Sequence, residues 1–160
     1  MSPPGEPLGL ALTRTSRAVA RAFDARLAEA GGSLPIWLVL LNLRTRQIAN
    51  QRELAEAVGI QGATLTHHLN AMEAAGLLTR RRDPANRRVH LVELTESGIE
   101  LFHRLRAAAV AHDERIRVGF SDEDIATLTE LLIRMRGNVG RHALVVDGGP
   151  GGPAAVPAPG

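Results

Sequence analysis

The 160-residue sequence contains no cysteine, no tyrosine and no lysine, and its aromatic residues are one tryptophan and three phenylalanines. The lack of cysteine excludes disulfides and thiolate metal ligands. No apolar stretch approaches the roughly 18 residues that cross a bilayer, and the first residues lack the basic and apolar regions of a secretion signal. We therefore expect a cytoplasmic protein without a membrane partner.

All 19 basic residues are arginine, and 17 acidic residues reduce the formal net charge to +2. The sequence pI of 10.7 overstates this basicity, because no lysine, tyrosine or cysteine titrates between neutrality and the arginine range. Evidence for a polyanionic partner must therefore come from local clusters of arginine and not from the net charge. The length fits one domain with a core of its own.

Both ends of the chain have compositions typical of disorder. Residues 1–7 are rich in proline, and glycine and proline fill nine of the fourteen positions in 147–160. Between them, apolar residues recur at steps of three and four in 8–32 and in 99–146, which predicts one long N-terminal helix and two C-terminal ones. A helix from Leu34 is apolar nearly all round and should form the centre of the core.

The middle of the chain predicts a helix-turn-helix followed by a β-hairpin. Asn50 can cap a short helix that ends at Gly59, and a second helix begins three residues later and ends at about Ala75. Two apolar-leaning runs within 76–98 then flank a polar loop that contains Pro84, as in a hairpin.

The expected fold class is therefore mainly α (α+β), a winged helix-turn-helix over 33–98 with a two-stranded wing. Such a core needs only the middle of the chain, so the helices of 8–32 and 99–146 must bury their apolar stripes elsewhere. Pairing with a second copy is the simplest solution and makes these helices a dimerisation region. A two-fold dimer places equivalent helices about 34 Å apart, one turn of B-DNA, and predicts a pseudo-palindromic target.

On a helical wheel, Leu65, Leu69 and Met72 fall on one side of the second helix of the motif. The opposite side is small and polar, as a helix that enters the major groove requires, although a solvated surface helix would look similar. The candidates for base contacts on and beside this outer face are Gln61, Ala63, Thr64, Thr66, His67 and Asn70. Gln and Asn can pair with adenine through two hydrogen bonds, and Thr can meet a thymine methyl group.

Five arginines and one acid lie within residues 80–88, and we expect the arginines at the tip of the hairpin. The arginines are Arg80, Arg81, Arg82, Arg87 and Arg88, and the acid is Asp83. Guanidinium groups match phosphate oxygens, so this cluster suits a polyanion, although a merely solvated loop would have the same composition.

The sequence resembles the MarR family of bacterial transcriptional regulators over roughly residues 8–140. The resemblance rests on Leu34-Pro35, Glu53-Leu54-Ala55, Thr64-Leu65-Thr66, Leu69 to Met72-Glu73, Gly76-Leu77, Asp83-Pro84, Asn86-Arg87-Arg88, Leu94-Thr95 and Gly98. It implies a homodimer with a winged helix on each protomer that binds double-stranded DNA. It also implies repression, or occasionally activation, of promoters, and release by a small phenolic or otherwise anionic ligand.

By position, the resemblance makes Arg88 the wing residue that enters the minor groove, with Arg87 beside it, while Arg80, Arg81 and Arg82 touch phosphates. The family usually has an acid where this chain has Asn86, and that acid pairs with the arginine two residues on. Either Asp83 takes over this pairing or Arg88 is held less firmly.

An effector pocket is expected where the helix from Leu34 meets the dimerisation helices, with Trp37, Arg14, Arg17 and His112 as candidate ligand contacts. Trp37 is also a natural core residue.

No metal or cofactor is expected, because His103 and His112 lie about 13 Å apart along one helix. The sequence has no phosphate-binding glycine loop, nucleophile elbow or paired catalytic carboxylates, so we expect no enzyme. The alternative function is a winged helix used for protein contacts without sequence-specific DNA binding, whose hairpin would be expected to present apolar residues.

Overall fold

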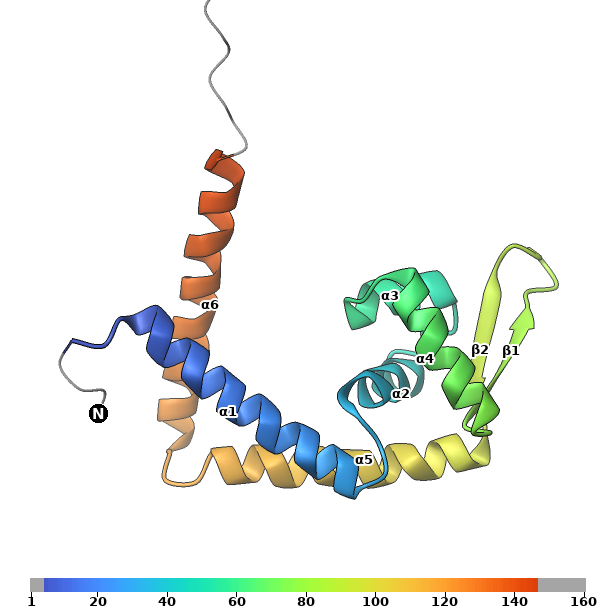
Figure 1. The fold of residues 1–160 in the computed structure, drawn as a ribbon, viewed down its shortest axis with the longest axis horizontal. Helices are drawn as coiled ribbons and strands as arrows, with labels where there is room; N and C mark the ends of the chain where they lie inside the picture. Colours follow the sequence, from blue (N-terminus) through green and yellow to red (C-terminus); the bar gives the residue numbers. More distant parts are fainter. Residues whose placement is uncertain (1–4, 147–160) are drawn as a thin grey trace, which may run out of the picture. The chain divides into compact units, whose positions relative to one another are not determined.

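The computed structural model describes residues 5–146, with the backbone alone for 141–146. The expected disorder of 1–4 and 147–160 lies outside the described residues, whereas Glu6 pairs with Arg14 at 2.8 Å. The elements are α1 (Leu8–Glu29), α2 (Leu34–Thr45), α3 (Gln51–Val58), α4 (Gly62–Ala74), β1 (Leu78–Arg82), β2 (His90–Leu94), α5 (Glu96–Ile116) and α6 (Asp122–Val146) (Figure 1). The predicted mainly helical fold with a two-stranded wing is confirmed.

The chain divides into two compact units, Met1–Ile116 and Arg117–Gly160. In the first unit, α2 lies at the centre of the core, as its apolar sequence predicts, and it packs against α1, α3, α4, α5 and β2. Leu27 from α1, Leu54 from α3 and Leu105 from α5 are fully buried around it. These three elements are therefore fixed to α2 by hydrophobic burial, the main favourable term in folding.

The helix-turn-helix follows from local chemistry. The Asn50 side chain accepts hydrogen bonds from the backbone N–H groups of Arg52 and Glu53, at 2.9 and 3.4 Å, and so caps α3. Gly59 ends α3 in the left-handed conformation, with φ of 75°, which glycine adopts without steric cost. The turn carries the chain into α4, whose Leu65 and Leu69 are fully buried as the wheel predicts.

The wing is an antiparallel pair in which Leu78 faces Leu94 and Arg80 faces Val92. Its stem is attached to the helices on both sides. The Val92 N–H donates to the Ala49 carbonyl at 2.8 Å, beside the start of α3, and the Thr95 N–H donates to the Leu77 carbonyl at 3.1 Å, at the start of α5.

The two helices α1 and α5 lie side by side within the first unit (Figure 1). Leu101, Phe102 and Leu105 of α5 are buried within this chain, and so is Leu27 of α1. The expectation that all the outer helices must bury their stripes elsewhere is therefore wrong for these segments, because the core is larger than the winged helix alone.

The second unit consists of α6, which begins with a capping box. The Ser121 hydroxyl accepts from the Asp124 N–H at 3.1 Å, and the Asp124 carboxylate accepts from the Ser121 N–H at 2.9 Å. The backbone hydrogen bond from Ser121, followed by the one from its side chain, lowers the pKa of Asp124. On the expected apolar face of α6, Leu128, Leu131 and Leu132 are exposed in this single chain. No helix in the described part of the chain is long and apolar enough to span a membrane.

Candidate nucleic-acid interface

The outer face of α4 is exposed, small and polar. Among the predicted contact residues, Gln61, Ala63, Thr64, His67 and Asn70 are all exposed, and Thr66 is half-buried. His68 is half-buried as well, on the inner flank. The helix thus presents to solvent the side chains that the wheel places outward, and no bulky apolar residue interrupts them.

Two hydrogen bonds occupy the hydroxyl of Thr66. The Gln51 Nε2 donates to its Oγ1 at 2.9 Å, and the Oγ1 donates to the Gly62 carbonyl at 2.9 Å. The contact holds the N-terminus of α3 against α4. It leaves the Thr66 methyl group as the part of this side chain best suited to touch a base.

Arg80 lies in β1, on the strand face that also carries the buried Leu78, and it therefore faces α4 rather than the tip of the wing. Its backbone N–H and its Nε donate to the Glu73 carboxylate at 3.1 and 3.0 Å. Its Nη2 donates to Glu73 at 2.6 Å and to the Asn70 Oδ1 at 2.5 Å. The side-chain hydrogen bond from Arg80 lowers the pKa of Glu73.

Arg81 lies on the opposite face of the wing and donates to the Glu93 carboxylate at 2.8 Å. The expectation that Arg80, Arg81 and Arg82 belong to the hairpin tip is wrong, because the strand extends through residue 82. Since acids from α4 and β2 neutralise two of these arginines, the free positive charge of the wing is smaller than its composition suggests.

Three arginines of the wing, one at the end of β1 and two in the loop, remain unpaired. Among the described residues, the guanidinium groups of Arg82, Arg87 and Arg88 have no acidic partner within 4 Å. Asp83 accepts from the Ala85 N–H at 2.9 Å, and Asn86 accepts from the Arg88 N–H at 3.2 Å. Neither side chain therefore anchors the Arg88 guanidinium. The sequence left open whether Asp83 pairs with Arg88 in place of the usual wing acid; in the structure it does not, and Arg88 is held less firmly.

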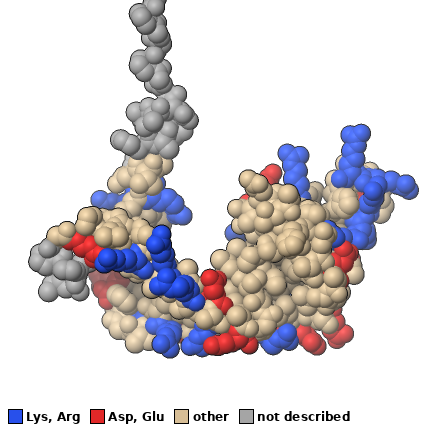
Figure 2. Space-filling model, in the orientation of Figure 1, with Lys and Arg blue, Asp and Glu red and all other residues tan. Residues whose placement is uncertain are grey.

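A groove of about 730 Å³ lies between α3, the start of α4 and the wing loop. Gln51 and Thr66 line one side, and Asn86, Arg88 and His90 line the other. Arginine side chains gather over the wing hairpin and project from it into solvent (Figure 2). The start of α4, through Gly62 and Thr66, and the wing arginine Arg88 thus line the same groove.

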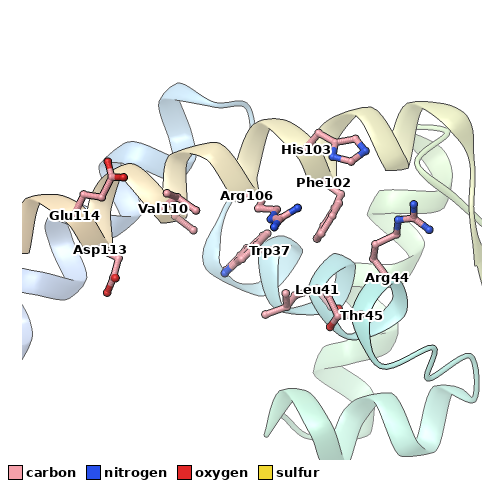
Figure 3. A pocket seen from close by; sticks show the side chains of 11 residues that line it. Trp37, Leu41, Arg44, Thr45, Phe102, His103, Arg106, Val110, Asp113 and Glu114 are labelled. Carbon is pink, nitrogen blue, oxygen red and sulfur yellow. The ribbon is translucent and has the colours of Figure 1, made fainter. Parts of the chain in front are cut away.

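A second hollow, of about 720 Å³, lies between α2 and α5 (Figure 3). Trp37 and Phe102 form an aromatic wall, with ring centroids 5.8 Å apart. Cationic side chains in the lining are Arg44 and Arg106, and Asp113 and Glu114 lie farther along α5. The hollow can accommodate a small aromatic molecule and presents arginines to an acidic group on it.

Of the four candidate ligand contacts, only Trp37 lines this hollow. Arg14 is exposed and paired with Glu6, and Arg17 is exposed on the same helix. His112 is buried against Phe23, with ring centroids 4.9 Å apart, and neither of its ring nitrogens has a hydrogen-bond partner among the residues that the structure describes. Arg14, Arg17 and His112 therefore do not line this hollow, because α1 covers a different side of α5.

Sequence reasoning missed the two acids that hold wing arginines, Glu73 and Glu93. It also missed the two arginines that line the hollow, Arg44 and Arg106. The strand alternation carries a signal for the first pair, since a residue two positions from a buried Leu78 must face inward. In the described residues, no three His, Asp or Glu side chains come together as metal ligands.

A model of the MarR family matches residues 33–90, which cover α2, the helix-turn-helix and most of the wing. The crystal structure of transcriptional regulator PA3341 is 34% identical, with a TM-score of 0.69, over 84% of this chain and 99% of that chain. The chain belongs to the MarR family.

Two further relatives of this MarR-family chain are informative. The uncharacterized HTH-type transcriptional regulator YdgJ of Bacillus subtilis (strain 168) is 32% identical over 90 residues, which make up 56% of this chain and 55% of that protein. The chain thus matches about half the length of this curated relative. The transcriptional repressor CouR, bound to a 23-mer DNA duplex, is 29% identical with a TM-score of 0.72, over 85% of this chain and 96% of that chain. The MarR family and these relatives are transcriptional regulators and not enzymes, as the sequence predicts.

Proposed function

We propose that this MarR-family protein is a homodimeric transcriptional repressor that binds a pseudo-palindromic operator. The observation that carries the proposal is the groove shared by the start of α4 and the wing loop, which Thr66 and Arg88 line, beside the exposed polar face of α4. The similarity to CouR, whose structure contains a DNA duplex, supports it. A module for protein contacts would be expected to present apolar side chains on the wing, where this chain has arginines.

In this proposal α4 enters the major groove and the wing tip enters the minor groove. The side chains of Gln61, Thr64 and His67 are exposed and have no hydrogen-bond partner within the described part of the chain, so they can contact base edges. Arg87 and Arg88 extend from the tip into a narrow A·T-rich minor groove, where negative potential is concentrated. The groove beside α3 then holds the intervening sugar-phosphate strand, with Arg52 and Arg88 as the arginines in its lining. Arg82, on β1, is a further candidate for a phosphate contact.

Dimerisation covers the apolar side chains that a single chain leaves in water. Exposed large apolar residues occur in α1, in the second half of α5 and in α6, and they include Leu12, Val110 and Leu131. Scattered apolar residues are common on surfaces, but several on three helices predict an interface. Two copies related by a two-fold axis would present their α4 helices to successive major grooves.

The hollow between α2 and α5 is the proposed effector site, for a small aromatic acid. Trp37 and Phe102 offer stacking surfaces, and Arg44 and Arg106 offer charge-assisted hydrogen bonds to a carboxylate. Because α5 continues directly from the wing through Thr95, a ligand against α5 touches the same element that carries the DNA-binding part. Release from the operator is the expected outcome.

Selection of bound duplexes from a random library by the full chain tests the proposal. We expect one enriched motif with two inverted half-sites whose centres lie about one helical turn apart, and a dimer in analytical ultracentrifugation. A monomer that enriches no motif at low salt would refute both DNA recognition and dimerisation.

A further inference from the structure

The Asn70 side-chain amide is held in one orientation by Arg80. The Arg80 Nη2 lies 2.5 Å from the Asn70 Oδ1 and 2.6 Å from Glu73. The Arg80 side chain is only 18% exposed, since it runs between β1 and α4. Rotating the amide by half a turn would place the Nδ2 hydrogens against the guanidinium hydrogens, so the contact opposes that flip.

This orientation determines which half of the amide is available to DNA. Oδ1 already accepts from a cation, whereas Nδ2 has no hydrogen-bond partner among the described residues, and Asn70 is exposed on the outer face of α4. A neighbouring guanidinium charge attracts acceptor groups and repels donor groups. Asn70 thus presents a hydrogen-bond donor in a positive local field.

The four bases differ in what they offer to such a donor. The major-groove edge of guanine carries two acceptors, N7 and O6, whereas adenine carries one acceptor and the N6 amino donor. Pairing of Asn with adenine through two hydrogen bonds uses Oδ1 as the acceptor for N6. In this structure Arg80 uses one of the two lone pairs of Oδ1, and its charge repels the N6 amino donor, so the usual pairing of Asn with adenine is disfavoured.

We propose that Arg80 is a positioning residue that makes Asn70 select guanine over adenine at one base pair in each half-site. The inference rests on the proposed function, since it needs α4 in the major groove. It revises the expectation that the Asn70 amide pairs with adenine. Glu73 completes the arrangement by holding the Arg80 guanidinium through its Nε and Nη2.

The test is selection from a random duplex library with the full-length protein and matched variants. Asn70→Ala removes the donor, and Asn70→Asp replaces it with an acceptor. Arg80→Met removes the positioning contact. Arg81→Met is the matched control, because Arg81 is the next residue of β1 and its side chain, on the opposite face of the strand from Arg80, pairs with Glu93. Circular dichroism verifies the fold of each variant.

The wild-type motif is expected to favour guanine over adenine at one position by at least about fivefold, the lower range for one mismatched base pair. Asn70→Ala should abolish this preference and leave the other positions unchanged, and Asn70→Asp should shift it toward cytosine, whose N4 donates. Arg80→Met should move the ratio of guanine to adenine toward adenine by about fivefold, whereas Arg81→Met should lower affinity with an unchanged motif.

Each alternative outcome refutes a distinct step. If Asn70→Ala retains the full wild-type motif, or if Arg80→Met and Arg81→Met alter it equally, the inference is wrong while the proposed function stands. If the wild type enriches no motif, the proposed function and the inference fail together. If Arg80→Met does not fold, Arg80→Lys is tested in its place, because lysine keeps a positive charge for Glu73 but lacks the forked guanidinium that reaches Asn70. An unchanged motif for Arg80→Lys would overturn the inference.

Discussion

The junction between the wing and α5 makes a substitution of Gly98 a sharp test of the structure. Gly98 lies in the first turn of α5, and its N–H donates to the Thr95 Oγ1 at 3.1 Å. A Cβ atom added at Gly98 would lie 2.0 Å from the Leu77 carbonyl oxygen, far inside the 3.0 Å limit of real contacts. Because the obstacle is backbone, no side-chain rotation relieves it.

Two opposing effects decide whether Gly98→Ala raises or lowers the free energy of unfolding. Alanine in a helix is favoured over glycine by about 0.5–1 kcal/mol. Relieving the clash requires a backbone shift of about 1 Å, with the usual overpacking cost of about 1–3 kcal/mol. The shift also strains the hydrogen bonds of Thr95 to Leu77 and Gly98, each worth about 1 kcal/mol. We expect a net loss of about 2 kcal/mol in the free energy of unfolding.

Urea denaturation at one fixed protein concentration measures this loss, since the stability of a dimer depends on concentration. The matched control is Gly9→Ala in the first turn of α1, where an added Cβ meets no atom within 4 Å. This control should be as stable as the wild type or more stable by up to about 1 kcal/mol. If Gly98→Ala were as stable as Gly9→Ala, the close approach of α5 to the wing would be refuted.

Three further predictions concern the site. Arg88→Ala should weaken operator binding and lower the slope of log affinity against log salt by about one for each protomer. Arg81→Ala should change this slope less, because Arg81 is already paired with Glu93. Equal slopes for the two variants in a salt titration would remove Arg88 from the interface. Benzoate-type acids should change the fluorescence of Trp37, the sole tryptophan, in a saturable way, and an unchanged spectrum up to millimolar ligand would count against the hollow as their site. Because Arg80 lowers the pKa of Glu73, their pairing stabilises the fold fully above the pKa that Glu73 has in the unfolded chain, and this stabilisation is lost as the pH falls through the pKa of Glu73 in the folded protein. The difference in unfolding free energy between wild type and Arg80→Met should therefore shrink over that pH range. A difference that does not change with pH would contradict this linkage.

The helices were predictable because their apolar spacing and caps agree. Asn50 and Gly59 bound α3 as the sequence predicts, and Leu65, Leu69 and Met72 are the buried face of α4. In such segments local propensity and tertiary packing favour the same structure, so a single sequence suffices to place them.

The partners of the charged residues were not predictable by the same means. Composition suggested five arginines at one tip, but the pairing of Arg80 with Glu73 depends on how β1 packs on α4. The pairing of Arg81 with Glu93 depends on the strand register, which places Glu93 diagonally across the ladder. The lining of the hollow depends on which side of α5 is covered by α1, and no periodicity in one helix specifies that.

The attachments at the base of the wing limit how this protein can respond to a signal. β2 is hydrogen-bonded to the segment before α3 through Val92 and Ala49, and Arg80 ties β1 to α4. The hairpin therefore cannot swing away from the helix-turn-helix without breaking several bonds at once, and only the loop around Pro84 to Arg87 is left to adapt. An effector would have to alter the separation or tilt of two intact DNA-binding units, so its action should appear as a changed tolerance for operator spacing rather than as a changed base preference.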